Sequence, residues 1–287
     1  MKGAKYMNHT NKSLKSFYLL WSTQSLSQLG SAVTEFALTL WLYEKTGSAL
    51  STATLTICTY APYVLMSIFG GAFTDRFDKK RIMLVCDGLA ALCTLLVFVL
   101  YRTNSLSIWH LYAINAFSGL MNTVQDPASE VAYTLVVPKD LYQKTSGMQS
   151  LSRSLISIGN PLIAAALYGA GGLDLVIFAD LSTFIVAFVT LLFFVRLPAV
   201  TGISLVEESM IQLVKEGIAF LRQNPLVLYV IVFMSGVNLV SSAFNATLPA
   251  LIIPTHGNNM LGIVTSCSGI AMILGSLIVT LMPKPKD

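Results

Sequence analysis

Charged residues are scarce in this chain of 287 residues, of which only 11% are Asp, Glu, Lys or Arg. Side chains typical of catalysis and metal binding are also few: three histidines and four cysteines, with no CxxC or Cys/His ligand spacing. They cannot be assembled into a nucleophile, a base and an orienting acid, and no P-loop is present. The sequence therefore predicts no enzyme, no ATP-driven pump, no resident metal and no cofactor.

Hydrophobic residues are abundant instead, at 54% of the chain, and the mean hydropathy is +0.69. Several apolar runs exceed the roughly 20 residues that cross the hydrocarbon core of a bilayer. We therefore expect an all-α integral membrane protein embedded in the lipid bilayer. Its spans are expected near residues 17–43, 49–71, 82–101, 105–128, 145–168, 174–195, 226–249 and 260–282.

Basic residues are distributed unevenly over the loops between these spans. When successive loops are assigned alternately to the two sides of the membrane, fifteen Lys and Arg residues fall on one side. Only Lys45 and Arg102 fall on the other side, and Arg153 lies inside a span. By the positive-inside rule, we expect a multi-pass plasma-membrane protein with both termini in the cytoplasm. The net charge of +4 then reflects topology, and no nucleic-acid partner is expected.

Three of the expected spans carry polar residues on one helical face, at steps of three or four residues. The members are Gln24, Gln28, Ser31, Glu35 and Thr39 in the first span, Asn115, Ser118, Asn122, Gln125 and Ser129 in the fourth, and Ser235, Asn238, Ser242 and Asn245 in the seventh. Such stripes face protein or water rather than lipid. They can simply join helices through hydrogen bonds. Three stripes on helices one, four and seven favour a shared water-filled cavity.

Glu35 lies inside the first span on this polar face, where a charge facing lipid would cost on the order of 3 kcal/mol. We expect it to bind protons or an organic cation. The alternative is a hydrated carboxylate near the outer mouth.

Two other ionisable residues fall inside spans. Arg153 is expected to form an intramembrane ion pair, with Asp126 as the assigned partner and Glu130 or Asp87 as alternatives. Asp180 in the sixth span lies toward the opposite end from Arg153, which argues against a pair between those two.

The connection between the second and third expected spans carries a charged motif. It has a Gly, three further residues, Asp-Arg and a basic cluster, and it resembles the cytoplasmic signature of the major facilitator superfamily. The matching residues are Gly71, Asp75, Arg76, Lys79 and Lys80. Asp78 stands where the commonest form of this signature has Gly, at a position that we expect to need a left-handed backbone. The resemblance implies a gating loop that grips the opposing helix bundle, with Asp75 and Arg76 as gate residues.

Other segments resemble the macrolide-efflux branch of that superfamily. These are Phe17 to Gly47 and the Pro127-Ala128 exit from the fourth span, within a resemblance that covers essentially the whole chain. It implies efflux of amphipathic or cationic small molecules, such as macrolide-like antibiotics, by a proton antiporter that works through alternating access. An antiporter motif of the fifth helix is only partly kept, because Ile156 and Asn160 replace two glycines.

Superfamily members have twelve spans in two six-helix halves, whereas this chain ends after the eighth. We expect a cytoplasmic N-terminus at 1–16, a complete six-helix bundle at 17–198, a cytoplasmic linker with an amphipathic helix at 199–225 and the first two helices of the C-terminal bundle at 226–287. A separate C-terminal half is a candidate partner, and the chain alone is expected to transport poorly. The alternatives are a non-transporting membrane fragment, a ligand-binding sensor or scaffold, or an exporter of another small molecule.

Overall fold

The computed structural model describes residues 2–138, 141–195, 197 and 210–241, together with residues 244, 264, 267, 270, 271, 274, 275, 277 and 278. These residues belong to two compact units, Met1–Leu205 with Ser276–Asp287, and Val206–Gly275. All the regular elements in the described ranges are helices, so the all-α prediction is confirmed.

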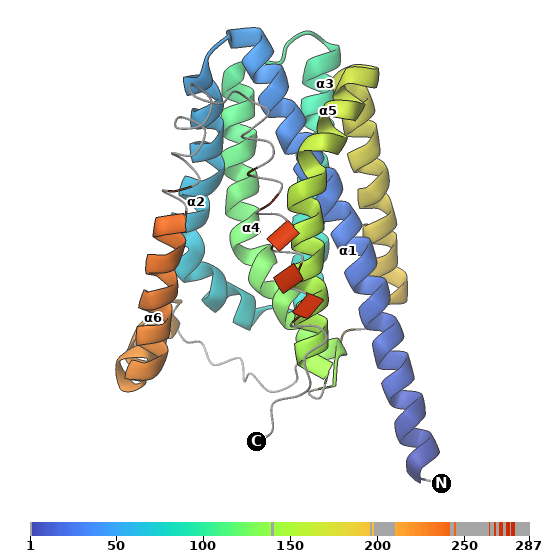
Figure 1. The fold of residues 1–287 in the computed structure, drawn as a ribbon, viewed down its shortest axis with the longest axis vertical. Helices are drawn as coiled ribbons and strands as arrows, with labels where there is room; N and C mark the ends of the chain where they lie inside the picture. Colours follow the sequence, from blue (N-terminus) through green and yellow to red (C-terminus); the bar gives the residue numbers. More distant parts are fainter. Residues whose placement is uncertain are drawn as a thin grey trace. The chain divides into compact units, whose positions relative to one another are not determined.

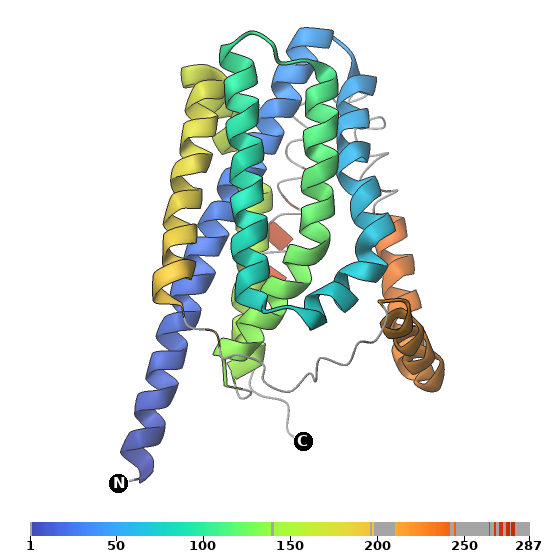
Figure 2. The same ribbon diagram turned by 180° about the vertical axis from the view of Figure 1, so that it is seen from behind.

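The first unit is an up-and-down bundle (Figures 1 and 2). Its helices are α1 (Lys2–Thr46), α2 (Ala49–Arg76), α3 (Lys79–Arg102), α4 (Ile108–Val136) and α5 (Tyr142–Val189), which continues into the π-helical η2 (Thr190–Phe194). Within α5 the chain reverses at Gly171 and Gly172, and Gly172 has φ +64°, a conformation that favours glycine. This reversal falls between the expected fifth and sixth spans.

Length and apolar composition mark two of the described helical stretches as candidate membrane spans, Lys79–Arg102 and Tyr142–Phe194. The number rises to four if each of two bent helix pairs is taken as one span. Neither α1 nor α4 is among these candidates, although both are long enough, because their polar stripes lower their hydropathy.

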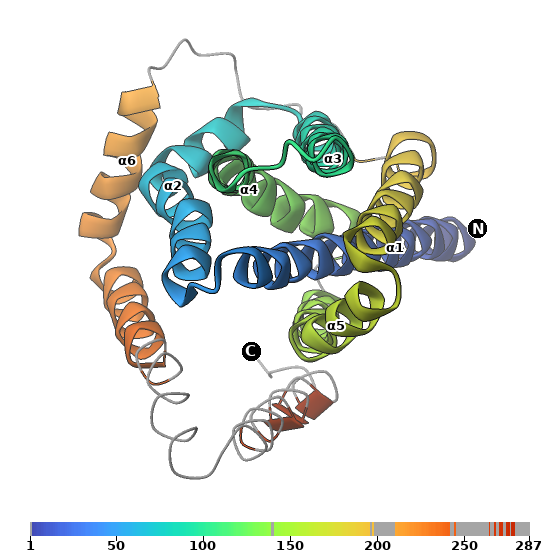
Figure 3. The same ribbon diagram turned by 90° about the horizontal axis from the view of Figure 1, so that it is seen from above.

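Two helix pairs approach closely where small residues face a neighbouring backbone. α1 packs along α5, and α2 packs along α4 (Figure 3). A Cβ added to Gly119 of α4 would lie 1.9 Å from the Thr59 carbonyl oxygen of α2, and one added to Gly70 would lie 2.3 Å from the Thr123 carbonyl oxygen. Backbone contact through glycine is typical of helix packing in membranes.

Buried apolar side chains form two clusters toward opposite ends of this bundle. Phe17, Leu20 and Met83 belong to the cluster near the α2–α3 connection. Leu42 and Leu111 belong to the cluster near the α1–α2 and α3–α4 connections. Most of each polar stripe, from Gln24 to Ser31 in α1 and from Asn115 to Gln125 in α4, lies between the buried members of the two clusters along its helix.

The second unit contains α6 (Met210–Gln223), which is followed after a bend of 102° by a helix over Pro225–Ser241. α6 lies in the segment expected to hold an amphipathic linker helix, and its apolar residues Ile218 and Phe220 are exposed. The expected eighth span, at 260–282, is described only at isolated positions.

Candidate functional site

A cavity of about 710 Å³ opens in the first unit, at the level between the two apolar clusters. The polar stripes of both α1 and α4 face it. Its lining includes Gln24, Gln28, Ser31 and Glu35 from α1, and Asn115, Ser118, Asn122, Gln125 and Ser129 from α4. The two stripes therefore meet at one cavity. Asn238 lies in the second unit, where its Nδ2 donates to the Met234 carbonyl oxygen at 3.0 Å, and Asn245 lies outside the described residues.

Glu35 lines this cavity and is exposed there. Its backbone carbonyl accepts a hydrogen bond from Thr39 Oγ1 at 3.0 Å, as in an ordinary helix. Over the described ranges, its carboxylate takes part in no hydrogen bond or ion pair. The carboxylate is thus open to a ligand that enters the cavity.

Asp87 of α3 is a second acidic group of the cavity, and it is only 6% exposed. Its Oδ2 accepts a hydrogen bond from Gln24 Nε2 of α1 at 3.2 Å, and its Oδ1 accepts one from Gln125 Nε2 of α4. The carboxylate therefore joins three helices. Gln24 and Gln125 of the predicted stripes therefore join helices through Asp87, in addition to lining the cavity.

Asp180, in the second helical segment of α5, is a third acidic group and is only 3% exposed. Its Oδ1 accepts a hydrogen bond from Ser31 Oγ of α1, and its Oδ2 accepts one from Thr94 Oγ1 of α3, both at 3.2 Å. Gly30 allows this contact, because a Cβ there would lie 3.0 Å from Asp180 Oδ1.

Asp87 and Asp180 were not assigned to the site by sequence reasoning, although both lie in expected spans. Neither belongs to a polar stripe, which was the pattern used to select cavity residues. A carboxylate in the middle of an apolar helix was itself a usable signal, since such groups require polar partners.

Arg153 pairs with Glu130 rather than with the assigned Asp126: its Nη2 donates to Glu130 Oε1. Asp126 contacts the Tyr63 hydroxyl of α2 and remains within electrostatic range of Arg153. Residues four apart share a helix face, so spacing alone could not separate the two candidates. The Arg153 and Glu130 side chains are 66% and 50% exposed, and both line the larger cavity.

The lysines of the signature connection hold helix ends within the first unit. The Lys79 ammonium is buried and donates to the carbonyl oxygens of Thr74, Asp75 and Phe77 at the end of α2. These are carbonyls that a helix end leaves without intrahelical partners.

Lys80 holds another helix end in a similar way. Its Nζ donates to the carbonyl oxygens of Leu192 and Val195, at 3.0 and 2.7 Å, where η2 ends. Asp75 and Arg76 are exposed. A Cβ at Gly71 would meet nothing within 4 Å.

The prediction of a left-handed backbone at Asp78 is wrong. Asp78 has φ −61° and ψ 122° and is the N-cap of α3, where its Oδ1 accepts a hydrogen bond from the Arg81 backbone N–H at 2.9 Å. Capping explains the residue type, because Asp is among the preferred N-cap residues.

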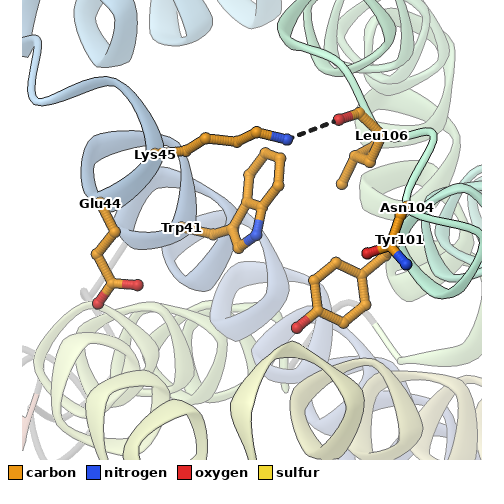
Figure 4. Close-up of a pocket in the computed structure, with 6 residues that line it drawn as sticks. All are labelled: Trp41, Glu44, Lys45, Tyr101, Asn104 and Leu106. Atoms are coloured by element: carbon orange, nitrogen blue, oxygen red, sulfur yellow. Dashed lines mark hydrogen bonds between the residues drawn. The ribbon is translucent and has the colours of Figure 1, made fainter.

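A smaller cavity of about 320 Å³ lies at the end of the bundle with the α3–α4 connection (Figure 4). Lys45 Nζ lies 4.6 Å from the centroid of a Trp41 ring and donates to the Leu106 carbonyl oxygen at 3.1 Å. Glu44 accepts a hydrogen bond from Tyr168 at 2.6 Å. These charged groups join α1 to neighbouring segments, and Glu44 lies outside the larger cavity.

Sequence comparison identifies the class of protein. The chain matches the model of the Major Facilitator Superfamily over residues 20–285, and it belongs to this superfamily. Membership defines a multi-pass membrane protein and points to a transporter rather than an enzyme.

Macrolide efflux proteins are among the individual relatives. Macrolide efflux protein A of Streptococcus pyogenes is 28% identical over 217 residues, which cover 75% of this chain and 53% of that protein. Macrolide efflux protein A of Enterococcus faecalis is 26% identical over 179 residues, 62% of this chain and 55% of that protein. The uncharacterized MFS-type transporter YkuC of Bacillus subtilis is 24% identical over 284 residues, 94% of this chain and 65% of that protein. The predicted macrolide-efflux-like membership is confirmed, and the chain spans about half the length of the macrolide efflux relatives it matches.

Proposed function

We propose that this protein acts in secondary active export of amphipathic or cationic small molecules, macrolide-like antibiotics among them, by alternating access around the cavity of the first unit. The observation that carries the proposal is the meeting of the α1 and α4 polar stripes at one cavity between two apolar clusters. The names of the macrolide efflux relatives support the substrate class.

Size and charge of the cavity agree with such a substrate. Its volume of about 710 Å³ lies within the roughly 300–1,000 Å³ typical of small-molecule sites. Its charged lining residues are one cation, Arg153, and five acids, Glu35, Asp87, Asp126, Glu130 and Asp180. An excess of carboxylates in a site of low dielectric constant attracts cations.

Glu35 is the proposed coupling residue, because its carboxylate is open to the cavity. A proton bound there neutralises the charge, and release of the proton restores attraction for a cationic substrate. Proton binding and substrate binding at one carboxylate then exclude each other, which is the requirement for exchange of the two across the membrane.

The proposal includes an orientation and a division of the chain. The α2–α3 connection and both termini face the cytoplasm, in agreement with the distribution of Lys and Arg. Residues 17–198 form the N-terminal bundle, residues 199–225 the linker and residues 226–287 the start of a second bundle. A C-terminal half would supply the opposite wall of the cavity, and the signature loop would meet it as a gate.

Glu35→Gln is expected to abolish proton-driven efflux while leaving the fold intact, since Gln keeps the size of the side chain and removes its charge. Accumulation in Glu35→Gln cells is therefore expected to match that in empty-vector cells, because a proton can no longer bind at this position and drive export. The measurement is accumulation of radiolabelled erythromycin in cells that express the protein, compared with cells that carry an empty vector.

Glu44→Gln is the matched control, because it makes the same change on the same helix outside the larger cavity. Equal accumulation in expressing and empty cells contradicts erythromycin export by this chain on its own, and erythromycin binding without efflux favours the sensor or scaffold alternative. Undiminished efflux by Glu35→Gln removes Glu35 from the mechanism without affecting the transport proposal.

A further inference from the structure

The Asp180 carboxylate differs from the other acids of the cavity because hydroxyl groups from two other helices surround it. Ser31 Oγ and Thr94 Oγ1 each lie 3.2 Å from one of its oxygens. Hydroxyl donors to a carboxylate ordinarily lie about 2.5–2.7 Å away. Both contacts are therefore long, and the carboxylate is only loosely held by them.

Thr34 adds a third hydroxyl, which contacts the Asp180 carboxylate without a hydrogen bond of ordinary geometry. Its Oγ1 lies against the Asp180 carboxylate, is fully buried and has no geometric hydrogen bond to any of the described residues. Thr39 and Thr46 of the same helix donate to the carbonyl four residues earlier, at 3.0 and 2.8 Å. Thr34 does not, although an unpaired buried hydroxyl costs about 1–3 kcal/mol. A buried hydroxyl held this loosely beside a carboxylate can be satisfied by a bound water or cation that contacts both groups.

The chemistry of these oxygens defines the ligand. Carboxylate and hydroxyl oxygens are hard ligands, which suit alkali and alkaline-earth cations rather than soft metals. Asp180 is the single acid of the group, and none of the ion pairs seen in the described ranges involves it. One negative charge is balanced by a monovalent cation, whereas a divalent cation would leave an excess charge in a buried site.

We propose that Asp180, Ser31, Thr34 and Thr94 form a binding site for a small alkali cation, with Na⁺ as its ligand. All four residues line the larger cavity, so the ion has a route to the site. Gly30 lets α1 approach closely enough to present two hydroxyls to Asp180, because a Cβ there would lie 2.4 Å from Thr183 Oγ1 and 3.0 Å from Asp180 Oδ1.

The position of the site also indicates a use. Ser31 and Glu35 are one helical turn apart, about 6 Å along the axis of α1. A cation beside Ser31 therefore repels a second cation at Glu35, since like charges at this distance interact strongly in a medium of low dielectric constant. A role for Na⁺ as a second coupling ion rests on the proposed transport function, whereas Na⁺ binding itself does not.

The test is the unfolding temperature of the purified chain in detergent, at fixed pH, in NaCl and in choline chloride of equal ionic strength. A ligand that binds the folded state raises this temperature by mass action. We expect Na⁺, and not choline, to raise it. Thr34→Val removes one oxygen ligand at constant shape and should weaken Na⁺ affinity about fivefold, so that about five times more NaCl is needed for the same rise in unfolding temperature, whereas Thr34→Ser keeps the oxygen and the response.

Asp180→Asn should lose the Na⁺ response entirely. Asp174→Asn removes a carboxylate that pairs with Arg102 outside the larger cavity, and it should retain the response. If Asp180→Asn does not fold, the two Thr34 variants decide. Equal unfolding temperatures of the native chain in the two salts, or a full response in Thr34→Val, overturns the site.

Failure of this proposal and failure of the transport function are distinguishable. A Na⁺ response without erythromycin export retains the cation site and contradicts transport. Export without a Na⁺ response retains transport and removes the cation site.

Discussion

Replacing Gly119 by alanine is expected to force α2 and α4 apart and to lower the unfolding temperature of the protein by several degrees. The new Cβ would lie 1.9 Å from the Thr59 carbonyl oxygen and 2.9 Å from its carbonyl carbon. Both are backbone atoms in the middle of a helix, so no flexible side chain can move away. The expected cost is about 3 kcal/mol, at the upper end of the usual range for overpacking.

The separation should also open the cavity wall, because Thr59 Oγ1 donates to Asn115 Oδ1 at 3.3 Å beside this crossing. Thermal unfolding in detergent, followed by circular dichroism, measures the effect. Gly88→Ala is the control, since it makes the same change inside α3 at a position where a Cβ meets nothing within 4 Å. Similar unfolding temperatures for the two variants would show that the α2–α4 crossing is looser than the structure indicates.

Helical periodicity was sufficient to find the two cavity walls. The stripe from Gln24 to Glu35 and the stripe from Asn115 to Ser129 repeat at three- and four-residue steps, and each occupies one face of a helix that lines the cavity. Periodicity works here because it depends only on the helix to which a residue belongs. Apolar run length marks α3 and the Tyr142–Phe194 stretch as candidate membrane spans, but not α1 or α4, whose polar stripes lower their hydropathy.

Contacts between helices could not be predicted in this way, because they depend on how each helix is rotated and how far it is shifted. The hydrogen bonds from Gln24 and Gln125 to Asp87 require three helices to meet at one depth. The choice of Glu130 over Asp126 by Arg153 depends on the register between α4 and α5. Asp78 was misread because its role as an N-cap appears only once the start of α3 is known.

Lys79→Met is expected to destabilise the end of α2. This lysine of the signature therefore has a structural role in addition to any role in a gate. Its buried ammonium donates to three carbonyl oxygens, of Thr74 at 2.5 Å, Phe77 at 3.2 Å and Asp75 at 3.3 Å. Methionine fills a similar volume but leaves these acceptors unpaired. The expected loss is about 2–3 kcal/mol of unfolding free energy, the value of hydrogen bonds to a charged group.

Arg81→Met separates this contribution from the charge of the loop. Arg81 belongs to the same basic cluster but is exposed, and its recorded hydrogen bond comes from its backbone N–H. Its replacement should change the unfolding temperature little, since exposed charges contribute little to stability. Hydrogen exchange of residues 70–77 provides the local measurement, with faster exchange expected in Lys79→Met alone. If Lys79→Met instead left stability and exchange unchanged but impaired efflux, Lys79 would act in the gate and not as a cap of α2.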